Sequence, residues 1–203
     1  MITGELSTRQ KLLEVAEVLF ARKGIEATLV GDIVQGAGQR NPSALRYHFG
    51  SREGILQAIR EKYLVQLEVR RTAMLATWPD TTTPRECVEL IVVPLGEMLS
   101  TEAGRRYLRI LGQTIYQLEP EQIDQVPPNF PSLMRSIELL RASIGDLPAP
   151  VVNERVRGAI LLATALLAVR ARELTGRRRL PLSAADFQAN VIDMTVAALT
   201  AQS

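Results

Sequence analysis

The amino-acid sequence predicts an all-α fold. Strand signals are nearly absent, because no stretch sustains an apolar-polar alternation and the chain contains no Asn-Gly or Asp-Gly hairpin turn. Apolar residues instead recur at intervals of three and four residues, the spacing of one helix face. With 203 residues, 46% of them hydrophobic, the chain can bury a real core. We therefore expect a small helical head, residues 1–50, and a larger helical body, residues 51–203.

The first two helices are predicted from capping and stop signals. Residues 7–10, Ser-Thr-Arg-Gln, have the spacing of a capping box, and apolar residues then follow at helical spacing until Gly24. These signals predict a helix over 8–23. Thr28 can cap a second, short helix that ends near residue 36.

The third helix is predicted to be short and the fourth to be long. Asn41 as N-cap and Pro42 at the first helical position open the third helix. Ser51 caps the fourth, whose apolar positions continue toward Trp78 before the breaker residues 79–84. In the body, helical patterns cover about 85–99, 105–118, 132–144, 151–175 and 183–201, with an irregular connector over 119–131.

Composition argues against several classes of protein. A single cysteine, Cys87, excludes an internal disulfide, and no secretory signal pattern occurs, so we expect a cytoplasmic protein. No apolar run reaches the roughly 20 residues that cross a bilayer, so we expect no membrane association. One histidine, His48, cannot form a His-rich metal site, and P-loop and Gly-x-Ser-x-Gly motifs are absent. We therefore expect no metal, no cofactor and no enzyme, although catalysis by carboxylates alone stays open.

The formal charge is nearly balanced but unevenly distributed. Residues 1–62 contain nine Lys and Arg against seven Asp and Glu, whereas residues 63–203 contain 15 of each kind. The small positive excess in the first third is weak support for a nucleic-acid partner.

The short second and third helices have the geometry of a helix-turn-helix. In that motif a glycine-containing turn joins two short helices, and the second of them lies in the DNA major groove. Leu45 and Phe49 are four residues apart and are expected to face the other helices. The positions between them then project outward, and an arginine such as Arg46 is suited to bidentate contact with guanine. From composition alone, a lone His beside Phe is more often a partly buried structural residue.

The order of these residues resembles the tetracycline-repressor-like (TetR) family of transcriptional regulators over roughly residues 8–60. The matching positions are Gly24, Thr28, Asp32-Ile33, Ala37-Gly38, Leu45-Arg46-Tyr47-His48-Phe49 and Ser51-Arg52-Glu53-Gly54-Ile55-Leu56. The resemblance implies that Thr28, Tyr47, His48 and Arg52 contact the DNA backbone and that Ser43, Ala44 and Arg46 face bases.

The sequence departs from the family pattern at several positions. The spacer before Ala44 is one residue longer than usual, Arg46 replaces a common Tyr, and Arg52 replaces a common Lys. Gly54 stands where an Ala-like residue is usual, which predicts a first turn of the fourth helix weakened by up to about 1 kcal/mol.

The helix near 151–175 is expected to contribute to a dimer interface. Its segment 159–169 is apolar all round except for Thr164, so it must be covered on every side. The resemblance implies a four-helix dimer interface made with the last helix, for which we select Ala159, Ala163, Leu167, Phe187, Val191 and Met194. Complete burial within a monomer is the alternative.

The helices between head and interface are expected to bind a small molecule, because regulators of this family typically release DNA on ligand binding. Candidate lining residues are Tyr63, Trp78, Met98, Tyr107, Leu111, Thr114 and Tyr116. They can equally be plain core residues. With few polar candidates, we expect an apolar or aromatic ligand.

Together these observations predict a homodimeric DNA-binding regulator, a repressor that binds a palindromic operator in double-stranded DNA and is released by a small molecule. A helical protein-interaction module is the alternative, and an enzyme is a weaker one.

Overall fold

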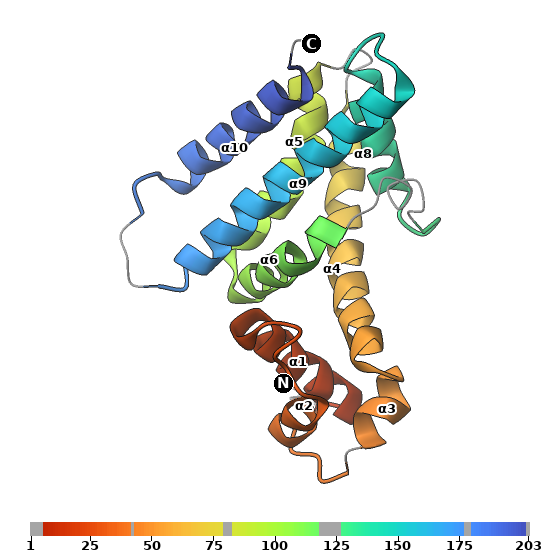
Figure 1. Cartoon of the computed structure of the whole chain (residues 1–203), viewed down its shortest axis with the longest axis vertical. Coiled ribbons are helices and arrows are strands. Elements are labelled where there is room, and N and C mark those ends of the chain that lie inside the picture. Colours follow the sequence, from red (N-terminus) through yellow and green to blue (C-terminus); the bar gives the residue numbers. More distant parts are fainter. Residues whose placement is uncertain (1–5, 42, 79–82, 118–126, 177–179, 202–203) are drawn as a thin grey trace. The chain divides into compact units, whose positions relative to one another are not determined.

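The computed structural model describes residues 6–41, 43–78, 83–117, 127–176 and 180–201, and these residues form helices and their connections with no strand (Figure 1). The contacts divide the chain into two compact units, Met1–Tyr63 and Leu64–Ser203. The helix α4, Arg52–Leu75, supplies residues to both units. The first unit therefore extends past residue 50, the boundary expected from the sequence, because the first turns of α4 help to close its core.

The first unit begins with α1, Thr8–Lys23, over the predicted range. Both halves of the predicted capping box form: the Ser7 hydroxyl accepts the Gln10 N–H at 3.3 Å, and the Gln10 side chain accepts the Ser7 N–H at 2.9 Å. Gly24 ends the helix with a positive φ of 101°, and its N–H donates to the carbonyl of Phe20. A terminus specified by residues within one turn was thus predictable from the sequence.

The second helix, α2, starts later than its predicted cap. It covers Val30–Gly36, and its N-cap is Leu29, which offers no side-chain hydrogen bond. The prediction that Thr28 caps this helix is wrong, because the Thr28 hydroxyl donates to the carbonyl of Gly24 at 2.6 Å. Thr28 therefore stabilises the connection between α1 and α2.

The third helix, α3, covers Ser43–Phe49. The Asn41 side chain accepts the Ser43 N–H at 2.9 Å, which confirms Asn41 as a capping residue. Pro42 lies outside the described residues. Ser51 caps α4, because its hydroxyl accepts the Gly54 N–H at 3.1 Å.

The core of the first unit also contains one buried carboxylate. Glu17 on α1 is 1% exposed and accepts hydrogen bonds from the Tyr63 hydroxyl and the Lys62 ammonium, each at 2.8 Å. Both donors lie on α4, so the carboxylate fastens α1 to α4. The core of this unit also contains the buried apolar side chains Leu12, Ala16, Phe20, Ile33, Leu45, Ile55 and Ile59.

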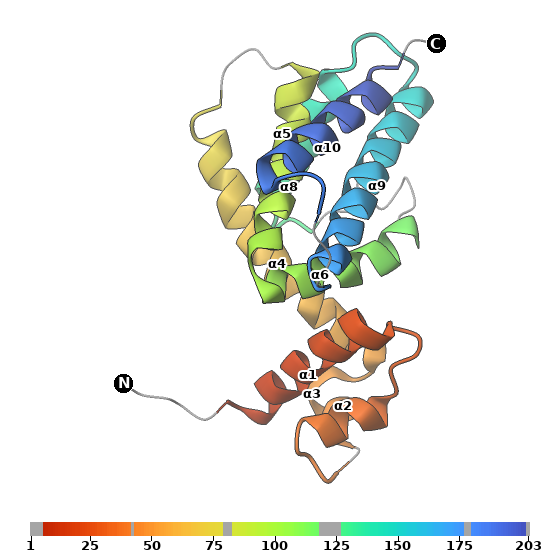
Figure 2. The same ribbon diagram turned by 90° about the vertical axis from the view of Figure 1, so that its left-hand side faces the viewer.

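The second unit is a bundle of the remaining helices (Figures 1 and 2). These are α5 (Pro84–Glu97), α6 (Glu102–Thr114), α8 (Pro131–Ala142), α9 (Ala149–Glu173) and α10 (Ala184–Leu199), with 3₁₀ turns η1 (Met98–Ser100) and η2 (Ile115–Gln117). The helix α9 packs against α6, α5 and α10, and α10 also packs against α5. The predicted body helices are confirmed within a few residues, except that 105–118 divides into α6 and η2. Of the predicted connector 119–131, residues 119–126 lie outside the described part.

Among the helices of the described ranges, none is both long and apolar enough to cross a membrane.

Gly54 lies where α4 passes the end of α3. A Cβ at this position would stand 1.9 Å from the carbonyl oxygen of Phe49, a backbone atom that cannot move aside cheaply. The sequence predicted that glycine weakens this turn, whereas the structure uses its missing side chain to bring α3 and α4 together. At Gly31, on α2, a Cβ would meet nothing within 4 Å.

We expect Gly54→Ala to lower the stability of the first unit. Overpacking costs about 1–3 kcal/mol, which exceeds the gain in helix propensity of about 1 kcal/mol. Calorimetric unfolding of the full chain measures the change, with Gly31→Ala as the matched control that gains propensity without a clash. A Gly54→Ala protein as stable as Gly31→Ala would contradict this packing.

Candidate nucleic-acid interface

A glycine turn sets the direction in which the chain leaves α2. The Gly38 N–H donates to the carbonyl of Gln35, and the Gln39 N–H donates to the carbonyl of Val34, both at 3.0 Å. Gly38 has a φ of 69°, in the left-handed region that favours glycine. This is the Schellman arrangement of a helix C-terminus. It satisfies the last carbonyls of α2 and redirects the chain into α3.

The inner face of α3 packs as its spacing predicted. Leu45 is 1% exposed. Phe49 is half-buried, and the guanidinium of Arg9 on α1 lies 4.9 Å from the centre of its ring. Because these two residues are one helical turn apart, they orient the whole of α3.

The outer face of α3 carries the polar candidates. Ser43 and Arg46 are exposed, and Tyr47 is 86% exposed. His48 is half-buried, and its ring lies 5.0 Å from that of Tyr47 in an edge-to-face arrangement. His48 therefore packs within a run of aromatic residues and also borders the exposed face. Both the structural and the DNA-contacting interpretation of the lone histidine are compatible with this position. Ala44, also half-buried, lies at the edge of this face.

The surface around α3 is positively charged. Residues 36–50 contain no Asp or Glu, while Arg40 and Arg46 are both exposed. The nearest acids have basic partners, because Asp32 pairs with Lys23 at 2.8 Å and Glu53 pairs with Arg52 at 3.4 Å. Arg40 was not selected from the sequence, although the absence of acids on both sides of it was a usable signal.

Two of the predicted DNA contacts are engaged inside the head. The Arg52 guanidinium donates to the carbonyls of Ile25 and Glu26, at 3.3 and 3.4 Å, and to the Glu26 carboxylate at 3.0 Å. Arg52 therefore holds the connection after α1. Thr28 is 1% exposed, so its side chain does not reach the surface.

The predicted ligand residues lie in different environments. Tyr63 belongs to the first unit, where it bonds Glu17, and Tyr116 is 69% exposed. Tyr107 is buried, and the Thr114 hydroxyl donates to the carbonyl of Leu111 at 3.2 Å. The remaining three, Trp78, Met98 and Leu111, are half-buried.

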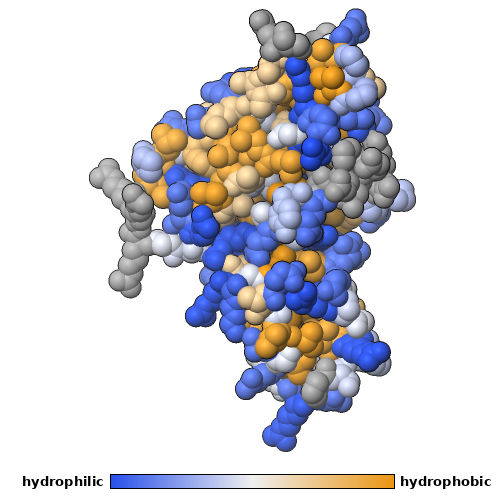
Figure 3. Space-filling model, viewed as in Figure 1, coloured by the Kyte–Doolittle hydropathy of each residue, from blue (hydrophilic) through white to orange (hydrophobic). Residues whose placement is uncertain are grey.

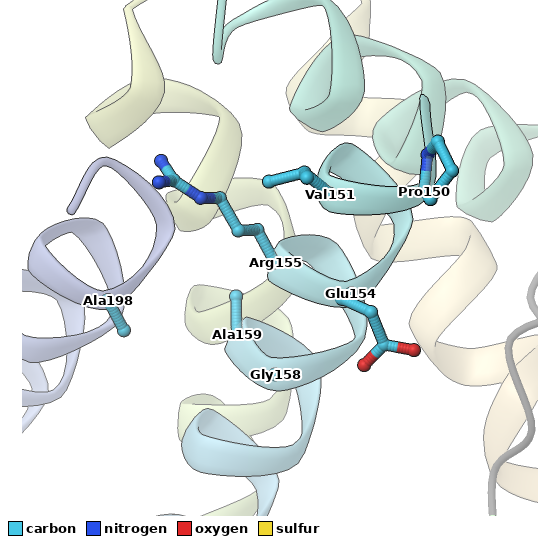
Figure 4. Close-up of a pocket in the computed structure, with 7 residues that line it drawn as sticks. All are labelled: Pro150, Val151, Glu154, Arg155, Gly158, Ala159 and Ala198. Atoms are coloured by element: carbon cyan, nitrogen blue, oxygen red, sulfur yellow. The ribbon is translucent and has the colours of Figure 1, made fainter. Parts of the chain in front are cut away.

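A groove of about 550 Å³ lies between α9 and the end of α10 (Figure 4). Arg155 extends toward α10, where its guanidinium donates to the carbonyl of Leu199 at 3.3 Å, whereas Glu154 points away. The groove is lined by Pro150, Val151, Glu154, Arg155, Gly158, Ala159 and Ala198. It contains none of the predicted ligand residues, but it includes Ala159, which was predicted for the dimer interface.

The predicted interface residues fall on both sides of their helices. Four are buried within the chain, with at most 2% exposure: Ala159, Ala163, Leu167 and Val191. Phe187 is half-buried beneath the Arg170 guanidinium, 4.8 Å from its ring centre, and Met194 is 41% exposed. The first four pack into the chain's own core, and the sequence of an all-apolar helix does not reveal which of its sides does so.

Hydrophobic side chains nevertheless gather over α9 and α10 on the face shown in Figure 3. The exposed small and apolar residues of these two helices include Gly158, Ala165 and Val169 on α9 and Met194 and Ala198 on α10. We call these five residues the α9–α10 face.

Comparisons with known proteins agree with this architecture. Residues 12–59 match the family model described as bacterial regulatory proteins, tetR family. The chain is 37% identical over 70 residues to the HTH-type transcriptional repressor KstR2 of Mycobacterium tuberculosis. These 70 residues make up 34% of this chain and 34% of that repressor. It is 30% identical over 121 residues to KstR2 of Mycolicibacterium smegmatis, covering 60% of this chain and 54% of the relative. The match thus spans about a third to a half of these relatives.

Solved structures of low sequence identity share the fold along the whole chain. The TetR family regulator PfmR from Thermus thermophilus superposes with a TM-score of 0.54 at 23% identity, over 91% of this chain and 96% of that one. The structure described as the ketosteroid transcriptional regulator KstR2 of Mycobacterium tuberculosis gives 0.54 at 22% identity, covering both chains completely. The match of residues 12–59, together with the helix-turn-helix geometry of α2 and α3, identifies this part of the chain as the N-terminal module of the tetR family of bacterial regulatory proteins.

Proposed function

We propose that this protein is a homodimeric, DNA-binding transcriptional repressor of the cytoplasm whose operator binding is released by a small molecule. The match of residues 12–59 to a family of regulatory proteins supports a regulator over an enzyme. The observation that carries the DNA-binding proposal is the outer face of α3, which is exposed, free of acidic residues and oriented by a rigid turn. Relatives named transcriptional repressors support the direction of control.

In the proposed complex α3 lies in the major groove. Arg46 is the base-reading residue, because an exposed guanidinium can donate two hydrogen bonds to guanine. Ser43 reaches an adjacent base edge, and Tyr47 donates its hydroxyl to a phosphate. Arg40, in the turn, adds a phosphate contact that depends on charge alone.

Arg52 contributes in a different way. Its donors already hold the connection between α1 and α2 against α4, so its main effect on DNA binding is to fix the head. The edge of the guanidinium that stays accessible can reach a phosphate. His48 supports Tyr47 by its edge-to-face contact and reaches the same strand.

The dimer is proposed to form through the α9–α10 face. A helix of about seven residues touches too few bases to select one site in a genome, so two heads must act together. The α9–α10 face supplies small and apolar residues on the solvent side of two adjacent helices, which suits close helix packing with a second copy. The resulting two-fold symmetry matches a palindromic operator.

We expect Arg46→Ala to reduce affinity for the cognate site by about 1–3 kcal/mol and to relax base preference at one position. The cognate duplex is first selected from random sequences with the native protein, and affinities are then measured by fluorescence anisotropy on that duplex and its single-base variants. Arg22→Ala removes the same charge from an exposed position on α1 and is the control. Equal losses on every duplex would make Arg46 a phosphate contact.

We expect Arg52→Ala to weaken binding to specific and non-specific duplexes alike and to reduce the salt slope by about one. The melting temperature should fall as well, since the bonds to Ile25 and Glu26 are lost. Binding titrations at several salt concentrations, with calorimetry of the free protein, measure both effects. If the Arg52→Ala protein had native stability and an unchanged salt slope, Arg52 would neither stabilise the head nor contact DNA.

We expect Val169→Arg to produce folded monomers that lose operator affinity, because an unpaired charge in a dry interface costs several kcal/mol. Val69→Arg, at an exposed valine of α4, is the control that should leave the dimer intact. Sedimentation velocity measures the state of each variant. Ala163→Arg is unsuitable, since Ala163 is completely buried and the change would damage the core. A Val169→Arg dimer with native affinity would place the interface elsewhere.

A further inference from the structure

The second unit buries a guanidinium whose charge is poorly matched. Arg71 on α4 is 3% exposed, and its Nε donates to the carbonyl of Leu90 on α5 at 3.2 Å. Its Nη1 is buried and has no hydrogen-bond partner among the described residues. A guanidinium carries five N–H donors, and a buried charge is stable only when its donors are paired. The Leu90 carbonyl is a neutral acceptor and leaves the charge and the Nη1 donors unmatched.

The acidic side chain nearest in sequence is already engaged elsewhere. Glu68 lies one helical turn before Arg71, but its carboxylate accepts the backbone N–H groups of Ser132 and, at 3.1 Å, Leu133. These groups belong to the first turn of α8, where a carboxylate neutralises the positive end of the helix. Glu68 therefore attracts Arg71 only through space. Burial, partly offset by Glu68 and Tyr107, lowers the pKa of Arg71 to about 10, so the side chain remains charged at neutral pH.

Other buried groups of this unit lack acceptors in the same way. The indole Nε1 of Trp78 and the Nε of Arg105 have no hydrogen-bond partner in the described part of the chain. Trp78 follows Arg71 by seven positions, about two helical turns, across the end of α4. Since buried polar groups are normally paired, these buried N–H donors call for an acceptor that the described residues do not supply.

We propose that Arg71 binds the carboxylate of a small-molecule ligand in the second unit. The inference rests on the proposed function, in which this unit binds the releasing ligand, and it names the chemical class of that ligand. A carboxylate can accept two parallel N–H bonds from a guanidinium. The ligand is then an organic acid, which refines the apolar or aromatic compound expected from the sequence by adding one anionic group.

The cost of the buried charge explains why an acid is selected over a neutral analogue. Without the ligand, Arg71 is desolvated, and among the described residues its guanidinium donates only to the neutral Leu90 carbonyl. A carboxylate supplies both the opposite charge and the missing acceptors, whereas an amide of the same shape supplies only a neutral oxygen. Binding energy is therefore concentrated in the charged group of the ligand.

The test compares benzoate with benzamide, which have the same ring and nearly the same shape. Thermal unfolding of the full-length protein is followed by the fluorescence of Trp78, the only tryptophan of the chain, at constant ionic strength. The native protein should bind benzoate at least about tenfold more tightly than benzamide, as expected for a charge-assisted hydrogen bond. Arg71→Met should remove this preference. Arg71→Lys keeps the charge and should retain part of the preference for benzoate. This variant replaces Arg71→Met in the comparison if the Met variant does not fold.

Arg70→Met is the matched control, because Arg70 is the adjacent residue, is exposed and pairs with Glu97 at 2.7 Å. Its preference for benzoate should equal that of the native protein. Equal binding of benzoate and benzamide by the native protein would overturn the proposal, and so would a benzoate preference that survives in Arg71→Met. Because no DNA is present, a failure here is distinct from a failure of the head to bind an operator.

Discussion

A seven-residue helix gains too little from its own hydrogen bonds to persist in water, so α3 exists only because the rest of the head holds it. Leu45 anchors it to the core, the left-handed Gly38 directs the chain into it, and the missing side chain of Gly54 lets α4 approach its last carbonyl. The buried Glu17 carboxylate then fastens α1 to α4. The exposed face of α3 is therefore presented by a rigid support, as a surface that reads DNA requires.

The arginines of this protein illustrate how environment assigns a role to one kind of side chain. Arg46 is exposed beside no acid and is suited to bind a partner. Arg52 is committed to backbone carbonyls within the head. Arg71 is buried with too few acceptors, which makes it the candidate anchor for an acidic ligand. Their different roles follow from which acceptors lie within reach, because a guanidinium is charged in every one of these settings.

The helix α9 shows why an apolar segment is ambiguous. An all-apolar helix must be covered on each side, but its own residues do not say whether the cover is the same chain or a second copy. Ala163 and Leu167 are covered by the chain itself, whereas Val169 is 45% exposed. A shift of two positions along the helix, about 200° around its axis, separates a core residue from a surface residue.

The sequence by itself determined what depends on neighbours within a few residues. The helical class, the capping box at Ser7, the role of Asn41 and the inward face of Leu45 were predictable, since each depends on contacts within about one helical turn. Only the tertiary structure decided which residues from distant segments meet. Arg52 bonds Glu26, and Tyr63 bonds Glu17, across long stretches of the chain. The burial of Arg71 and the exposed side of α9 likewise depend on helices that are distant in sequence. No local pattern encodes such pairs, because they form only when packing brings separate helices together.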